Sequence, residues 1–381
     1  MSIKESSISF LHHFDELEDP RIDRHKLHSL PDTLLIMFCG VICGVESWRD
    51  FVDFGESKID YLRQFTDLDN GIPSKNTFNR VISSLNPEAF KKCFCGWVQN
   101  VQHELGDVIA IDGKALRRSF DKANDKSAIY MVSAFATEAK LVLAQQKVDE
   151  KSNEITAIPK LLELLELKGA VVTIDAMGCQ KSITKNIIDG GGNYAIAVKG
   201  NQKKLHAQIA RHFNHFFDMQ YNKHVDFSMR EELNRGRLET RKCLATSDID
   251  WLEGKEGWVG LKSIVAIESK RTVKEVTSIE TRYYISSLEP DSQEISRIIR
   301  SHWGVENALH WVLDVVFRED DSRIRSGHAA ENMARIKHVA LNLLQTAKPK
   351  FRKDMSIKRL RKKAGWDNET LDKIITTQIL S

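Results

Sequence analysis

Hydrophobic and polar positions recur at helical spacing through the first hundred residues. The apolar run 34–45 predicts a buried helix, and Pro31 and Asp32 suit its first turn. A membrane-spanning helix needs about 20 apolar residues, so this shorter run is read as a core helix. Ser74 is a suitable N-cap for the helix that follows it. We therefore expect residues 1–100 to form a helical domain.

The helix after Ser74 carries polar and basic residues on its early turns, among them Lys75 and Arg80. A helix, a turn and such a helix is the arrangement of a helix-turn-helix DNA reader. The turn, TDLDNGIP, is longer than that motif usually has, and plain helical packing explains the same pattern. The pattern leaves both interpretations open, and under the first Lys75 and Arg80 contact DNA.

Beyond about residue 107, strand-like and helix-like segments alternate. Short apolar runs, including DVIAIDGKAL, VVTIDA and NYAIAV, predict strands, and leucine- and isoleucine-rich runs between them predict helices. A sheet of this mixed order covered by helices is an α/β layer. Residues 222–290 are rich in β-branched positions and predict a β-rich insertion. The segment 346–381 is expected to be a basic tail ending in a short helix.

One long amphipathic helix is predicted from Ile295 to Asp320. Glu306 lies at its centre, and His302 and His310 lie one turn to either side. A carboxylate buried without a partner costs several kcal/mol, so Glu306 should meet a cation or point into a cleft. Two tryptophans lie nearby, of which Trp311 is the better candidate for the core and Trp303 for stacking on a base.

The overall composition is that of an ordinary globular protein, with 41% hydrophobic and 29% charged residues. The net charge of +3 says little about partners, but the stretch 348–363 holds nine Lys or Arg and one acid, which suits phosphate contact. The six cysteines form no CxxC and accompany no His cluster, which favours free thiols in a reducing cytoplasm over a structural zinc site. The N-terminus lacks a signal-peptide pattern, which also favours the cytoplasm and no membrane association.

Two predicted strands end in an aspartate, at Asp112 in IAIDG and at Asp175 in VTIDA. Ligands gather at the carboxyl ends of strands in open α/β sheets. With Glu306 they make three carboxylates, which would repel one another unless hard cations such as Mg²⁺ or Mn²⁺ joined them. Two such ions about 4 Å apart can activate a water or a 3′-hydroxyl against a phosphodiester. The alternative is that each aspartate caps a turn and that Glu306 pairs with Arg300 or His310.

Five runs carry a resemblance: AIDGKALRRS, KSNEITAIPKLL, VVTIDAMGCQ, AVKGNQK and RSHWGVENALHWVLDVVFRED. They resemble the insertion-sequence transposases of the H-repeat-associated type, in the DDE superfamily. The run DPRIDRHKLHSLPDTLLI, together with GIPSKNTFNRV, resembles the domain found ahead of that catalytic core. The resemblance implies a ribonuclease-H-like catalytic domain at 101–345 that contains the β-rich insertion.

The same resemblance implies that Asp112, Asp175 and Glu306 are the catalytic, metal-binding triad. It implies a DNA transposase that binds terminal inverted repeats, hydrolyses a phosphodiester with metal-activated water and joins the freed 3′-hydroxyl to target DNA. Two ions, Mg²⁺ or Mn²⁺, are expected, and bringing two DNA ends together implies a homodimer. The alternatives are a DNA-binding protein with a decayed core and a structure-selective nuclease of the same fold.

Several further residues are expected to contact DNA beside the triad. Relatives often carry Tyr, Arg and Lys around the glutamate, where this chain has Ile299, His302 and Leu313, so His302 is the first candidate to hold the terminal phosphate. Solvated surface is the alternative for Arg118, and a solvated hairpin is the alternative for Arg237 and its neighbours Arg235 and Gly236. The candidate set is Lys114, Arg118, Lys199, Asn201, Arg237, His302 and Trp303.

Overall fold

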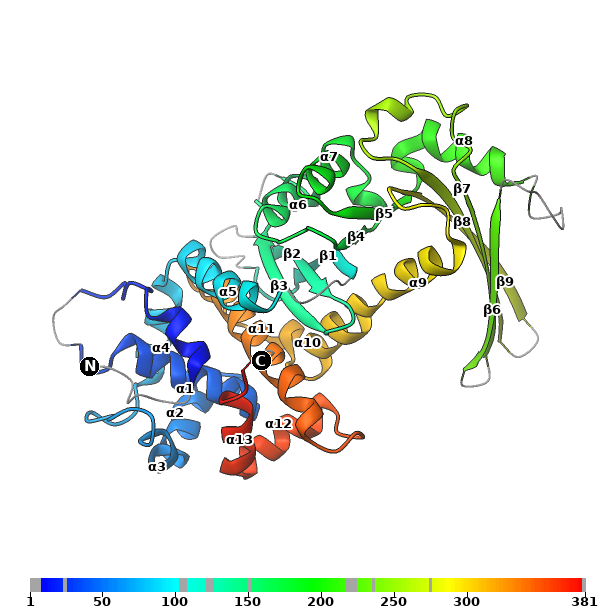
Figure 1. Ribbon diagram of the computed structural model, residues 1–381. Coiled ribbons are helices and arrows are strands. Elements are labelled where there is room, and N and C mark those ends of the chain that lie inside the picture. Colours follow the sequence, from blue (N-terminus) through cyan, green and yellow to red (C-terminus); the bar gives the residue numbers. More distant parts are fainter. Residues whose placement is uncertain are drawn as a thin grey trace.

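The computed structural model describes residues 8–22, 26–102, 108–120, 127–149, 152–214, 216, 225–234, 237–273 and 276–378. The molecule is elongated (Figure 1). Helices from the N-terminal and C-terminal parts of the chain form one end, a sheet flanked by helices forms the middle, and the long strands β6–β9 reach out at the other end.

The N-terminal helices are η1 (Ser9–Phe14), α1 (Leu30–Cys43), α2 (Trp48–Ser57), α3 (Ile59–Leu62), α4 (Lys75–Ser84) and α5 (Pro87–Gln102). The predicted core helix is confirmed, because α1 is buried along nearly its whole length. The predicted cap at Ser74 is also confirmed, since its hydroxyl accepts a hydrogen bond from the Thr77 amide at 3.3 Å. Lys75 and Arg80 are exposed on α4, and residues 63–74 separate this helix from α3.

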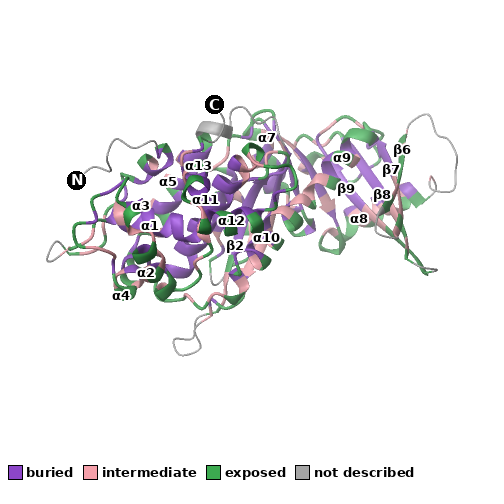
Figure 2. Ribbon diagram, turned by 90° about the horizontal axis from the view of Figure 1, so that it is seen from below, coloured by how far each residue is buried: buried purple, intermediate pink, exposed green. Residues whose placement is uncertain are grey.

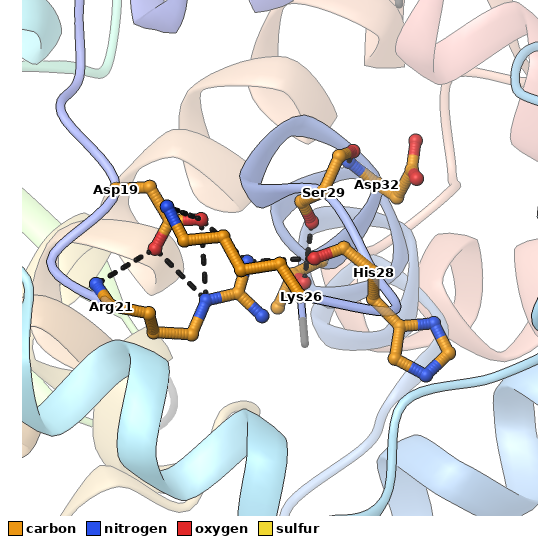
Figure 3. Close-up of polar contacts among 7 residues, drawn as sticks. Asp19, Arg21, Lys26, His28, Ser29 and Asp32 are labelled. Atoms are coloured by element: carbon orange, nitrogen blue, oxygen red, sulfur yellow. Dashed lines mark hydrogen bonds and ion pairs between the residues drawn. The ribbon is translucent and has the colours of Figure 1, made fainter. Parts of the chain in front are cut away.

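A network of polar contacts holds the segment that leads into α1 (Figure 3). The Arg21 guanidinium binds the Asp19 carboxylate at 2.6 Å and also donates to the His28 carbonyl at 2.7 Å. One residue later, the Ser29 hydroxyl accepts from the Asp32 amide at 3.1 Å and so caps the helix. These contacts fix the direction in which the chain enters the core of the helical end.

No single helix in the described part of the chain is long and apolar enough to cross a membrane. The pair α1 and α2 meets the length and composition criterion only when taken together, across a bend of 95°.

Within the described residues the sheet has nine strands, in the order β3-β2-β1-β4-β5-β9-β8-β7-β6. In the middle, β1 (Val108–Leu116), β4 (Val171–Ile174) and β5 (Asn193–Val198) are parallel. The hairpin of β2 (Ile129–Ala136) and β3 (Leu141–Lys147) pairs antiparallel with β1. This mixed arrangement confirms the predicted ribonuclease-H-like α/β sheet.

The predicted β-rich insertion is an extension of the same sheet. Its strands are β6 (Asp226–Asn234), β7 (Arg237–Thr246), β8 (Ser263–Val273) and β9 (Val276–Ser286). The last of them, β9, pairs antiparallel with β5. The inner halves of β8 and β9 are buried and their outer halves are exposed (Figure 2). The insertion therefore joins the catalytic core at one end and projects into solvent at the other.

Helices cover both faces of the sheet. On one face, α9 (Ser292–His302) crosses β1, β4 and β5 and reaches the insertion. On the other face lie α6 (Glu154–Leu162), α7 (Lys181–Asp189) and α8 (Lys203–Asn214). Strand side chains alternate between the two cores: Val108 packs with α9, whereas Ile109 and Ile111 pack with the opposite core. By this alternation Asp112 faces α9 and Gly113 faces α6.

The prediction of one continuous helix from Ile295 to Asp320 is wrong in one respect, because this helix is interrupted. It breaks after α9, continues as a π-helical segment (Val305–His310) and ends with α10 (Trp311–Val315), so that Asp320 lies in a separate turn, Glu319–Asp321. A π segment adds a residue to the turn and rotates the side chains that follow it. Trp311, expected in the core, is consequently 56% exposed.

The C-terminal residues fold back onto the helical end. The long helix α11 (Ala329–Ala347) packs on α1, and α12 (Ile357–Trp366) and α13 (Asn368–Ile375) pack on both. In the basic stretch, Arg361 is only 5% exposed. Its guanidinium donates to the Val41 carbonyl at 2.7 Å and to the Val316 carbonyl, and it lies 4.0 Å from the Phe317 ring centroid. This stretch thus connects the end of α1 with the end of the helix that carries Glu306.

Candidate active site

Strand pairing brings Asp112 and Asp175 to the same level of the sheet. The parallel ladder between β1 and β4 ends with the pair Ile111 and Ile174, so the two aspartates follow it side by side. Strand β1 continues beyond Asp112 to Leu116 because β2 still pairs with it, which corrects the expectation that the strand ends at the aspartate. The Asp175 carboxylate accepts from the Met177 amide at 3.0 Å and starts a short turn.

The helix that carries Glu306 completes a pocket with these two strands. The pocket has a volume of about 200 Å³. The two aspartates and Glu306 line it, and so do five further charged or aromatic side chains, namely Lys199, Arg282, Tyr284, His302 and Trp303. The carboxylates of all three predicted triad residues therefore border one cavity, although they come from positions far apart in the chain.

His302 is held at the wall of this pocket. Its Nδ1 lies 3.0 Å from the Thr173 hydroxyl. Burial lowers the pKa of His302, while the nearby carboxylates of Asp112, Asp175 and Glu306 act in the opposite direction. A lowered pKa leaves the imidazole mostly neutral at pH 7, so it can offer one hydrogen-bond donor without a full positive charge.

Neither of the ion pairs that the sequence left open for Glu306 is formed. Arg300 binds Glu232 of the insertion instead. His310 lies with its Nε2 3.2 Å from Oδ2 of Asp112. Among the described residues, the side chain of Glu306 has no hydrogen bond or ion pair, and it is exposed at the pocket. An unpaired carboxylate beside two others is available to bind a cation.

The donor set suits Mg²⁺ or Mn²⁺, because these ions prefer carboxylate oxygens. As the side chains stand, no three His, Cys, Asp or Glu groups among the described residues are close enough to share one ion. Asp175 and Glu306 are both exposed and can rotate towards a bound cation. The residues therefore fit a divalent ion by chemistry and position, with rotation of side chains as the remaining step.

Three of the predicted DNA contacts, Lys199, His302 and Trp303, lie at the pocket. The Arg282 guanidinium lies 4.8 Å from the Trp303 ring centroid, which orients both groups. Asn201 has a different environment: its amide donates to the Ala176 carbonyl at 2.5 Å. It thereby tethers the turn that follows Asp175.

The other predicted contacts do not line the pocket. The Lys114 ammonium pairs with Asp314 and with Glu319, the latter at 2.8 Å. Arg118 lies 3.8 Å from Asp321 at the surface. Lys75 and Arg80 lie at the helical end, and Arg237 lies at the outer end of the insertion. Arg235 and Gly236 lie outside the described residues.

Sequence reasoning missed Arg282 and Tyr284 of the insertion, which both line the pocket. The two residues are two positions apart on β9, so the sequence indicates only that their side chains lie on the same face of the strand. The pairing of Tyr284 with Ala197 of β5 brings that face to the catalytic edge, and this pairing joins segments far apart in the chain. No local signal marks it.

Comparison with known proteins shows the family of the chain. Residues 103–343 match the family described as Transposase DDE domain, and residues 11–98 match the family described as DDE_Tnp_1-associated. The chain belongs to the DDE transposase family. Membership in this family indicates an enzyme that acts on DNA and, in general, one that uses divalent metal ions.

Relatives of similar length are also named as transposases. A "Putative transposase YncI" of Escherichia coli is 42% identical over 377 residues, which cover 97% of this chain and 95% of the relative. An "H repeat-associated putative transposase YhhI" of Escherichia coli is 41% identical over 97% of this chain and 98% of the relative. A shorter match, 49% identical over 15% of this chain and 68% of the relative, is named "Inactive transposase YbfQ", also from Escherichia coli.

Proposed function

We propose that the protein is the transposase of an insertion sequence. It binds the terminal inverted repeats of the element, hydrolyses a phosphodiester at each end and joins the freed 3′-hydroxyl to target DNA. The observation that carries this proposal is the pocket bordered by Asp112, Asp175 and Glu306. These three carboxylates hold two Mg²⁺ or Mn²⁺ ions, which supply an activated water or hydroxyl and stabilise the leaving oxygen.

The remaining pocket residues position DNA. Lys199 and Arg282 face the carboxylates from β5 and β9 and bind the phosphates on either side of the reacting bond. His302, fixed by Thr173, donates a hydrogen bond to the terminal phosphate. Trp303 offers its exposed face to an unpaired base, since stacking does not depend on which base it is.

DNA contacts away from the pocket complete the proposal. Lys75 and Arg80 are exposed on α4 at the helical end and read the terminal repeat, while Arg237 on the insertion contacts the backbone. The distance between these two ends of the molecule suits a long stretch of duplex (Figure 1). Pairing of two DNA ends makes the working form a homodimer. The six cysteines are all free thiols, in keeping with work in the bacterial cytoplasm.

The test uses duplexes that carry the terminal repeat of the element that encodes the chain. The wild type with Mg²⁺ should cut the repeat end and join it to a plasmid. Asp175→Asn and Glu306→Gln should lose both steps but still bind the repeat, whereas Glu166→Gln, a change of an exposed glutamate after α6, should leave both steps intact.

Other outcomes would decide against the proposal. Unchanged joining by Asp175→Asn would exclude this aspartate from the chemistry. Cutting without joining, on DNA of any end sequence, would make the protein a structure-selective nuclease. Repeat binding by the wild type with no metal-dependent cutting would make it a DNA-binding protein with a decayed core.

A further inference from the structure

A fourth carboxylate lies next to the two aspartates, on the opposite side of β1 from α9. Glu154 is the first residue of α6 and lies against Gly113, the residue after Asp112. A Cβ atom on Gly113 would stand 2.1 Å from Oε1 and 3.1 Å from Oε2 of Glu154. The carboxylate therefore occupies the space that any other residue at position 113 would need. The absence of a side chain at Gly113 is what lets Glu154 reach the catalytic edge.

The surroundings of Glu154 disfavour the charged form of its carboxylate unless a cation is present. Burial raises the pKa of Glu154, and the carboxylates of Asp175 and Asp112 raise it further. Among the described residues, no hydrogen-bond donor or basic side chain pairs with it. A half-buried carboxylate that faces two others and no cation is destabilising, and a shared divalent ion removes the repulsion.

We propose that Glu154 is a fourth ligand of the catalytic metal site. This assignment rests on the function proposed above. It places metal ligands on both faces of the sheet. Asp112 and Asp175 stand at the end of the parallel strands and would hold the metal from there. Glu306 would contribute its carboxylate from the α9 side, and Glu154 would contribute its carboxylate from the α6 side.

A purely structural role for Glu154 makes different predictions. A glutamate in the first turn of a helix stabilises that helix modestly through the helix dipole. Replacement by glutamine would then lower stability slightly, whether or not metal is present. Metal affinity would not change.

The decisive experiment is calorimetric titration of the full-length protein with Mn²⁺ in the absence of DNA. Glu154→Gln keeps the size of the side chain and should lose one of two bound ions or about tenfold in affinity, the lower range for altered metal surroundings. Glu163→Gln is the matched control, because Glu163 is exposed at the other end of the same helix. Thermal unfolding with Mn²⁺ gives a second readout, since the stabilisation by metal should shrink in Glu154→Gln alone.

Gly113→Ala tests the geometry without removing the charge. The added methyl group displaces the flexible end of Glu154, so this variant should lose as much Mn²⁺ affinity as Glu154→Gln. In the double variant the alanine should add no further loss, because the carboxylate that it displaces is already gone. Gly96→Ala is the control, since a Cβ there meets no atom within 4 Å.

The outcomes separate this inference from the proposed function. If Asp112→Asn weakens Mn²⁺ binding while Glu154→Gln binds like the wild type, Glu154 is not a ligand and the function stands. If Asp112→Asn also binds like the wild type, the metal site is not where the function requires it. A loss in Gly113→Ala that persists in full in the Glu154→Gln background would likewise overturn the role of Glu154.

Discussion

The Thr173 hydroxyl and Nδ1 of His302 lie 3.0 Å apart and join the strand that ends at Asp175 to the helix that carries Glu306. Thr173 is almost fully buried and faces α9. With Nδ1 occupied by this contact, only Nε2 of His302 is left for other partners. The contact therefore orients the imidazole at the pocket wall as well as linking two elements.

We predict that Thr173→Val slows DNA cleavage by up to about tenfold, because one net hydrogen bond contributes about 0.5–1.5 kcal/mol. Repeat binding should be nearly unchanged. Single-turnover cleavage with saturating Mg²⁺ measures the effect. Thr184→Val is the control, since Thr184 is also buried and donates to a carbonyl on α7, away from the pocket. Equal slowing in both variants would trace the effect to general stability.

Lys114→Met should destabilise the fold by about 3–5 kcal/mol, the usual cost of removing one partner of a buried ion pair. The Lys114 ammonium neutralises the buried Glu319 carboxylate, whose pKa it helps to hold below the ordinary value even though burial alone would raise it. Urea unfolding at pH 7 measures the loss. Arg118→Met removes a contact of 3.8 Å at the surface and should cost less than about 1 kcal/mol. Similar stabilities for the two variants would contradict the pairing.

Arg361→Met should loosen the attachment of the helical end to the helix that carries Glu306. It leaves the Val316 carbonyl without its buried donor, which costs about 1–3 kcal/mol, while the Val41 carbonyl keeps the Gly44 amide as a donor at 3.2 Å. Urea unfolding and limited proteolysis of α12 measure this change. Lys362→Met alters the exposed neighbour on the same helix and should behave like the wild type. An unaltered Arg361→Met would show that α12 is held by its apolar face alone.

His338 should make stability depend on pH. Burial lowers the pKa of His338 to about 4, whereas an unfolded histidine titrates near 6.5. Between these values only the unfolded state takes up the proton, so stability is lost as the pH falls from about 6.5 towards 4. By about pH 5 this loss amounts to roughly 2 kcal/mol.

His338→Gln should remove that part of the pH dependence. The measurement is the unfolding free energy at about pH 7 and about pH 5, compared between variants. His12→Gln is the control, because this histidine is half exposed and pairs with Asp15 at the surface. An equal slope in His338→Gln and the wild type would mean that other groups govern acid unfolding.

Local sequence patterns were sufficient to predict the helices and strands, but they did not predict where a helix is interrupted. The cap at Ser74 and the apolar run of β1 act within a few residues, so sequence reveals them. The helix around Glu306 kept its periodicity through Trp303 and Gly304, yet the structure contains a π segment there. Such a segment depends on how both halves of the helix pack, and that packing is not local.

The charge of a residue also proved a poor guide to its contacts. Lys114 and Arg361 belong to basic runs that suggest phosphate binding, but both side chains are buried against acids or carbonyls of distant elements. Arg282 was overlooked for the opposite reason, since nothing beside it in the chain indicates a site. A cation binds whichever acceptor the fold places within reach, and sequence does not specify that acceptor.

The sequence by itself determined the family, the order of helices and strands, and the residue types that suit a divalent-metal site, because these follow from local periodicity and from motifs. Only the tertiary structure decided that the insertion extends the core sheet, that Arg282 faces the carboxylates, and that Glu154 fills the space left by Gly113. Each of these depends on strand register and helix packing between distant segments. Such contacts are selected by burial and shape across the whole chain, which no single stretch of sequence contains.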